Sequence, residues 1–168
     1  TGHSEIFVTG CAVSPFKYTE AETWVQYRKL QRKIEAGASF AITQLGYDAD
    51  KYEELLIFNR QNNITIPALA SLYLLGKGPA TVMHSGKVPG VHVSKRLFAQ
   101  IAKEYEVKGE GPKLAIERTA RLGAVLKGIG YKGIHIGGVH KSFDTVAAIL
   151  DRIASGFEGL PIQDVAHP

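Results

Sequence analysis

The stretch from Glu35 to Asp48 constrains the fold of this chain most, because it contains the pattern of a complete helix–strand–helix junction. Gly37 suits the position just past a helix C-terminus, where a left-handed backbone carries no side-chain penalty. Residues 39–45 are short and apolar in their middle, which is typical of a strand covered on both faces. Asp48 is placed to cap the helix that follows. The stretch therefore predicts a buried strand between two helices.

Polar residues end this predicted strand. Thr43 and Gln44 follow an otherwise apolar run. In a parallel α/β sheet, the polar residues at the carboxyl end of a strand face the functional site. Gln44 is therefore the first candidate for contacting a ligand, although a satisfied polar group at a strand end explains the pattern equally well.

The same alternation of strand and helix runs along the whole chain. Further strands are predicted at three places: residues 5–13, within residues 64–75, and residues 133–138. Apolar residues at helical spacing follow each of them, with capping residues at Thr19, Ser94 and Ser142. The first helix carries Trp24 and Tyr27 on a stripe that is expected to be core. Residues 108–112, KGEGP, are expected to form a loop.

This pattern predicts one α/β domain over residues 1–158, with an irregular C-terminal tail over residues 159–168. Strands that alternate with helices pair in parallel through right-handed crossovers. Two architectures fit, a small open α/β sheet or part of an eight-stranded (β/α) TIM barrel. A whole barrel typically needs roughly 250 residues, so the 168 residues here would supply its second half, about four βα units.

Composition narrows the functional class. The net charge of +4 is mild, and its Lys and Arg residues are scattered along predicted helices, so no nucleic-acid partner is expected. No apolar run is long enough to span a membrane and no signal-peptide pattern is present, so no membrane partner is expected. The single Cys11 excludes an internal disulfide and fits a reducing compartment. These features indicate a cytoplasmic protein.

Histidine and cysteine residues are weaker candidates for metal-binding or catalytic residues. His135 and His140 have no carboxylate or Cys cluster beside them, so no metal site is predicted, and His84 and His92 fall in the region after the third strand. Cys11 lacks an evident partner base for nucleophilic catalysis.

Gly137 and Gly138 precede a helix. They could let backbone N–H groups approach a phosphate of a cofactor, or they could form a tight strand-to-helix turn. The sequence favours neither interpretation.

Several stretches carry a family resemblance. LQRKIEAGASFAITQLGYDADKYEELL, residues 30–56, resembles the C-terminal half of the methylenetetrahydrofolate reductases, which are FAD-dependent (β/α) barrels. VPGVHVSKRLFAQI, residues 88–101, resembles the segment after the family's seventh strand, and YKGIHIGG, residues 131–138, falls where the eighth strand should be. The A-G-A-x-x-x-I-T-Q core is the most specific part of the match.

The resemblance implies roles for four residues. Gln44 matches the family's glutamine that hydrogen-bonds the pterin ring of the folate substrate, and Tyr47 follows it as a possible wall of the same site. Lys33 matches a lysine that contacts FAD, and Ala38 matches an alanine that packs behind the flavin.

The sequence also departs from the family. Gln26 stands where family members carry an acidic residue that contacts FAD. Gly137 and Gly138 occupy the neighbourhood of a tyrosine and an arginine that help to hold the folate, and His140 and Lys141 are the nearest polar groups. The family's general acid lies on the first four strands and has no counterpart here, so no catalytic residue is assigned.

The resemblance implies an oxidoreductase of one-carbon metabolism. Such an enzyme uses FAD to pass a hydride between NAD(P)H and a folate-bound one-carbon unit. The alternative is a non-catalytic half-barrel module that binds a folate or completes a partner's barrel. An open half barrel leaves two sheet edges unpaired, so we expect a homo-oligomer or association with a missing N-terminal half.

Overall fold

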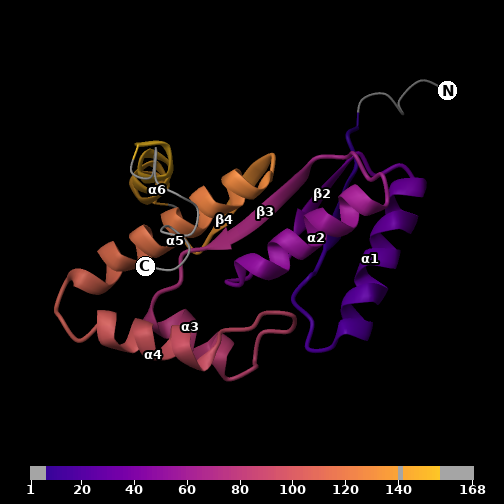
Figure 1. Ribbon diagram of the computed structural model, residues 1–168. Helices are drawn as coiled ribbons and strands as arrows, with labels where there is room; N and C mark the ends of the chain where they lie inside the picture. Colours follow the sequence, from indigo (N-terminus) through magenta and orange to yellow (C-terminus); the bar gives the residue numbers. More distant parts are fainter. Residues whose placement is uncertain (1–6, 140–141, 156–168) are drawn as a thin grey trace.

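Strands and helices alternate along the chain, as the sequence predicts, and the strands form one parallel sheet (Figure 1). The computed structural model describes residues 7–139 and 142–155. Its strands, paired in the order β1-β2-β3-β4, are β1 (Gly10–Val13), β2 (Phe40–Thr43), β3 (Ala68–Tyr73) and β4 (Gly133–Gly137). Its helices are α1 (Glu20–Glu35), α2 (Ala49–Gln61), α3 (Lys77–His84), α4 (Lys95–Glu104), α5 (Glu110–Ile129) and α6 (Phe143–Ser155). This confirms an α/β fold of the partial (β/α)-barrel type.

Local signals in the sequence placed both ends of α1 and the start of α2 correctly. Thr19 and Glu22 form a reciprocal capping box at the start of α1, and the Asp48 carboxylate accepts hydrogen bonds from the backbone of Asp50 and Lys51 at the start of α2. Gly37 follows α1 with φ +103°, a conformation that favours glycine. The junction around residues 35–48 is therefore built as its sequence predicts.

One face of the sheet is covered by helices. Tyr52 from α2, Leu72 from β3 and Leu126 from α5 are all fully buried in one cluster. A second cluster joins α1 and α2 to β1 and β2 through Tyr27, Leu55 and neighbouring apolar residues. This helix-covered face holds the main apolar core, whose burial drives folding.

The opposite face of the sheet is open. Phe40, Ile42 and Leu69 point to this side, are only half-buried and belong to none of the core clusters of the described residues. The helices α3 and α4 lie together beyond the arrowhead end of β3 (Figure 1), where a third cluster packs them onto Leu75 and Tyr73. They therefore cap the carboxyl edge of the sheet, where sites form in parallel α/β folds.

Some sequence predictions were wrong. Trp24 is 47% exposed, because the buried stripe of α1 follows Thr23, Tyr27 and Leu30 and leaves the indole beside it, edge-on to Phe58. Residues 108–112 are not all loop, since α5 begins at Glu110. Pro112 is tolerated there because the first turn of a helix does not need its missing N–H group.

Other predictions differ only at their boundaries or are not tested. Strand β1 begins at Gly10, so residues 7–9 of the predicted strand are not part of it, and its residues 5–6 lie outside the described residues. Helix α3 begins at Lys77, before the expected residue 80. His140, Lys141 and the predicted tail at 159–168 lie outside the described residues. None of the described helices combines the length and apolar character needed to cross a bilayer.

Candidate functional site

A cavity of about 590 Å³ lies beside β1 and β2, and we call it the Gln44 cavity. The Gln44 backbone N–H donates to Val13 O at 2.7 Å, which extends the β1–β2 ladder by one residue. The side-chain Oε1 of Gln44 accepts from the Leu45 backbone at 2.9 Å. No partner of its Nε2 group is found among the described residues, so the amide can still donate to a ligand.

Helix α1 contributes Lys33 and Gln26 to the same cavity. The Lys33 ammonium donates to Ala12 O at 2.7 Å and keeps two further protons for other acceptors. The structure thus brings Lys33 and Gln44 together, as the family resemblance implies. Ala38 is buried. Cys11 also lines the cavity, and burial raises the pKa of its thiol while Lys33 partly offsets this, so it is not an activated nucleophile.

Ser14 is a residue of this cavity that the sequence did not single out. Its hydroxyl is buried and has no hydrogen-bond partner among the described residues. Such groups are rare in folded proteins, because an unsatisfied buried hydroxyl costs about 1–3 kcal/mol. The Ser14 hydroxyl is therefore an unused hydrogen-bonding group at the wall of the cavity.

Polar residues lie side by side on the four neighbouring strands, in a row across the open face of the sheet. Ser71 on β3 pairs in register with His135 on β4, and the Ser71 hydroxyl lies 3.4 Å from His135 Nδ1. Extending the strand registers by one and two residues places Ser14 and Gln44 at the same level on β1 and β2. We call Ser14, Gln44, Ser71 and His135 the polar row. Neighbouring strands lie roughly 4.8 Å apart, so the row spans a width suited to a small heteroaromatic ligand.

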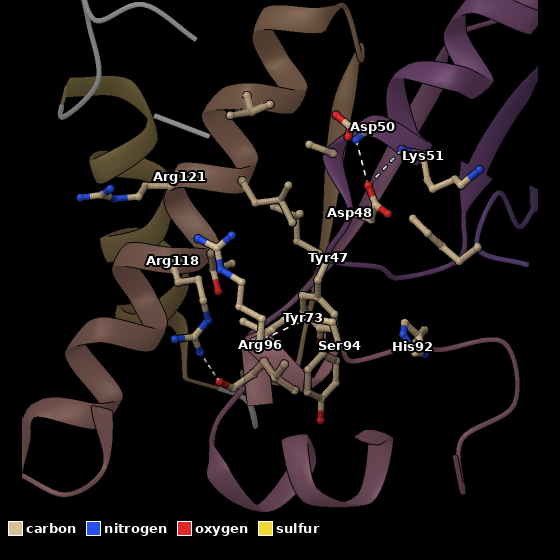
Figure 2. Close-up of a pocket in the computed structure, with 18 of the residues that line it drawn as sticks. Tyr47, Asp48, Asp50, Lys51, Tyr73, His92, Ser94, Arg96, Arg118 and Arg121 are labelled. Carbon is tan, nitrogen blue, oxygen red and sulfur yellow. Dashed lines mark hydrogen bonds between the residues drawn. The ribbon is translucent and has the colours of Figure 1, made fainter. Parts of the chain in front are cut away.

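A second cavity, of about 690 Å³, lies at the carboxyl edge of the sheet between the starts of α2 and α4 and the middle of α5. Figure 2 shows Arg96, Arg118 and Arg121 on one side of it, and Lys51 and His92 on the opposite side. We call it the arginine cavity. Tyr47 lines this cavity rather than the Gln44 cavity, and its hydroxyl lies 3.7 Å from the Met83 sulfur. Burial raises the pKa of the Tyr47 phenol.

Gly137, the last residue of β4, and Gly138, which follows it, line neither cavity. A Cβ at Gly138, where φ is +76°, would come within 2.7 Å of the Tyr73 ring, and one at Gly137 would come within 3.2 Å of it. The glycines therefore allow close packing of Tyr73, which accounts for a tight turn without a ligand. Their binding to a cofactor phosphate stays a prediction.

The histidines are placed apart from one another. His84 lies 2.8 Å from Val93 O through Nδ1 and stacks on Phe98, so it supports the segment before α4. His92 lines the arginine cavity and contacts Tyr18 edge-on. Within residues 7–139 and 142–155, no group of three potential metal-binding side chains comes together.

Comparison with known proteins identifies the family of this chain. A family model described as methylenetetrahydrofolate reductase matches residues 2–154. Among curated proteins, none matches the chain. A solved structure described as an uncharacterized protein from Clostridium thermocellum that binds two copies of 5-methyl-5,6,7,8-tetrahydrofolic acid shares the fold, with a TM-score of 0.57 and 16% identity. The similarity covers 84% of this chain and 50% of that chain, so this chain spans about half the length of that structure. By the extent of the family match, this chain belongs to the methylenetetrahydrofolate reductase family.

Proposed function

We propose that this chain provides the folate-binding part of an FAD-dependent reductase, which passes a hydride between NAD(P)H and a one-carbon unit carried by a folate. The Gln44 cavity carries this proposal, because an amide with free donors lies there beside an unpartnered buried hydroxyl. A glutamine side chain can donate and accept at once, which suits the amide-like edge of a pterin. Family membership supports the substrate class, as does the methyltetrahydrofolate bound by the structural neighbour.

The residues of the cavity fit a flavin beside the pterin. Lys33 has ammonium protons left for an anionic group, and the Ser14 hydroxyl can hydrogen-bond the edge of a ring. FAD, when bound, would supply the hydride chemistry, and the protein would bind and orient the reacting molecules. No carboxylate of the described residues lines the Gln44 cavity, so we assign no proton donor in it.

The first experiment measures flavin retention. The purified chain is incubated with excess FAD, desalted and examined by visible absorption. We expect a flavin band close to one equivalent. Lys33→Ala should reduce it, whereas Lys29→Ala, at an exposed position on the same helix outside the cavity, should leave it unchanged. Oxidation of the reduced flavin by methylenetetrahydrofolate would then test turnover.

The second experiment measures folate binding by isothermal titration with 5-methyltetrahydrofolate. Gln44→Ala should weaken binding roughly tenfold, the value of a buried hydrogen bond to a polar ligand. Gln61→Ala, at the exposed end of α2, is the matched control. Folate binding without flavin retention would favour the non-catalytic binding module over the reductase. A folded chain that binds neither molecule would contradict both functions.

A further inference from the structure

Strand β4 presents a single side chain to the open face of the sheet. Alternation along the strand puts Gly133, His135 and Gly137 on this face, because Ile134 and Ile136 pack with the clusters of the helix-covered face. The two glycines carry no side chain, and the His135 imidazole is exposed. The imidazole is therefore accessible to a ligand that lies on the open face.

Two side chains of β3 border this histidine. A Cβ built on Gly133 would lie 2.7 Å from Leu69 Cδ2, and one built on Gly137 would lie 3.2 Å from Tyr73 Cδ2. Both side chains therefore lean across to β4, at the positions before and after His135. The imidazole thus lies between an aliphatic and an aromatic side chain, which suits contact with a planar ring.

Ser71 can hold the imidazole in both of its protonation states. The serine is buried, and its hydroxyl lies 3.4 Å from His135 Nδ1. A hydroxyl can donate to the neutral ring and accept from the protonated one. Ser71 is itself held in place, because its backbone N–H donates to Thr43 Oγ1 at 3.0 Å and its carbonyl accepts from the Tyr52 hydroxyl at 2.6 Å. The Nε2 atom of His135 has no partner among the described residues, so it can exchange a proton with a ligand.

Few other titratable groups face this imidazole. Tyr73 is the titratable side chain beside it on β3, and the other side of β4 pairs with no strand of the described residues. Lys33 lies at the Gln44 cavity, on the far side of the polar row, and no carboxylate of the described residues lines that cavity. Histidine is the side-chain type best suited to proton transfer near neutral pH. Of the four residues in the polar row, His135 is the one that can supply it.

The position of His135 relative to Gln44 matches the shape of a folate. By the extended strand registers, the two residues lie two strands apart at one level, a separation of roughly 10 Å. In a folate, the amide-like edge of the pterin and the N10 nitrogen lie at opposite ends of the ring system. A folate with its amide edge at Gln44 and its ring along the polar row therefore directs N10 toward His135.

We infer that His135 is the proton donor of the proposed folate site and that Ser71 is its positioning residue. In a 5,10-methylene folate, one carbon bridges N5 and N10. The His135 imidazolium gives its Nε2 proton to N10 while the bond from the carbon to N10 breaks and its electron pair goes to N10. The carbon stays on N5 as an iminium cation that can accept a hydride, and the imidazole is left neutral. This inference rests on the proposed function and adds a catalytic residue to it.

The first test needs no flavin. Isothermal titration of the full chain with 5-methyltetrahydrofolate, in buffers of different ionisation enthalpy, measures the protons taken up on binding. We expect the wild type to take up a fraction of a proton at about pH 7, because a hydrogen bond from the imidazolium to N10 favours the protonated ring. His135→Gln should abolish this uptake. Lys132→Gln removes an exposed cation next to β4 and is the matched control, which should keep the uptake.

The second test separates proton donation from the other steps of turnover. The chain is loaded with FAD, reduced, and reoxidised either by methylenetetrahydrofolate or by menadione, which has no C–N bond to break. His135→Gln should slow the folate-dependent reaction roughly 10²–10⁴-fold, the usual contribution of a general acid, and leave the menadione reaction unchanged. The wild-type folate reaction should slow as the pH rises above about 7, where histidine side chains are mostly neutral. Ser71→Ala should slow it less and shift this pH profile, whereas Lys132→Gln should do neither.

Unchanged proton uptake in His135→Gln, or equal slowing of both reoxidation reactions, would overturn the inference and leave the proposed function intact. So would a wild type that binds the folate without taking up protons. If the chain binds the folate but retains no flavin, the first test alone decides the inference. Failure of the wild type to bind the folate would remove the proposed function and this inference with it. The urea midpoint of each variant checks that it is folded.

Discussion

The two faces of the sheet differ in what covers them, although each strand contributes alternate residues to both. On the helix-covered face, Ala70 and Leu72 of β3 are 0% and 1% exposed. On the open face, Leu69 of the same strand is half-buried, and Ser71 belongs to the polar row. Apolar burial contributes stability in proportion to the area removed from water, so the helix-covered face carries the stability of the domain. In the polar row, Ser71 is buried and lies beside His135, whereas the Ser14 hydroxyl and the Gln44 Nε2 group have no partner among the described residues and can bind a ligand.

The largest predicted effect is a loss of stability, and the same Leu→Ala substitution should cause a larger loss on the helix-covered face than on the open face. Leu72→Ala should lower the free energy of unfolding by about 2–5 kcal/mol, because it leaves a cavity in the main core. Leu69→Ala, three residues earlier on the opposite face, should cost less than about 1.5 kcal/mol, because its side chain is already partly in water. Urea unfolding of the two variants, at equal protein concentration, gives both values.

Equal losses would contradict the description of an open face. They would mean that something covers Leu69 in solution, and a second chain is the obvious covering partner for a half barrel with unpaired strand edges. The loss for Leu69→Ala would then depend on protein concentration, because binding of a partner stabilises by mass action. Repeating the measurement at a tenfold higher concentration distinguishes the two cases.

A smaller effect is expected from one hydroxyl inside the helix-covered face. The Tyr52 hydroxyl donates to Ser71 O at 2.6 Å and accepts from the Gly46 backbone at 3.1 Å. Tyr52→Phe would leave these buried backbone groups unsatisfied, so we expect a loss of about 1–3 kcal/mol. Tyr18→Phe, at a side chain that is 80% exposed, is the control and should change the unfolding midpoint little.

The order of strands and helices could be predicted well from the sequence, because the signals for it are local. The alternation of strand and helix, the cap at Asp48 and the turn at Gly37 each depend on a few consecutive residues. Trp24 was misplaced because the apolar residues of α1 fit two neighbouring stripes, and only packing against α2 selects one. The start of α5 was missed because Gly and Pro are common in loops and are also tolerated in the first turn of a helix.

The candidate site was predictable only in part. Gln44 stands at the end of a strand and Lys33 lies in a recognisable family motif, so both could be named from the sequence. Arg96 and Arg121 lie on different helices and read as ordinary solvated positions until the fold brings them to one cavity. Ser14 and Ser71 carry no sequence signal at all, because their interest comes from burial and from register across the sheet.

A pH-dependent effect is expected at the outer surface of the helix layer. Glu117 accepts hydrogen bonds from Arg152 and Arg121, and these contacts hold the pKa of its carboxyl below the usual value. A lowered folded-state pKa gives stability that is complete above the unfolded-state value of about 4.3 and is lost as the pH falls through the folded value. Glu117→Gln should therefore cost less than about 1 kcal/mol at pH 7, and this cost should shrink as the pH falls below about 4.3.

Urea titrations of wild type and Glu117→Gln between pH 3 and pH 7 test this difference. Glu53→Gln, at an exposed position of α2, is the control for removing a carboxylate. A difference between the Glu117 variant and wild type that grows toward low pH would contradict the assigned sign. The effect belongs to the helix layer, so it should leave folate affinity at the Gln44 cavity unchanged.

The smallest predicted effect is a gain in stability, and it comes from a substitution on the open face of the sheet. The buried Ser14 hydroxyl lacks a partner, so Ser14→Ala removes an unsatisfied group and should raise the free energy of unfolding by about 1 kcal/mol or less. The same substitution should weaken folate or flavin binding roughly threefold to tenfold, because the lost hydroxyl is the one that a ligand would satisfy. Ser39→Ala removes an exposed hydroxyl that donates to Thr9 O at 3.2 Å and should do neither.

A residue kept for packing cannot give higher stability and weaker binding together, since its removal lowers both. Greater stability with unchanged affinity would make Ser14 a structural residue, and the ligand would then have to be placed elsewhere on the polar row.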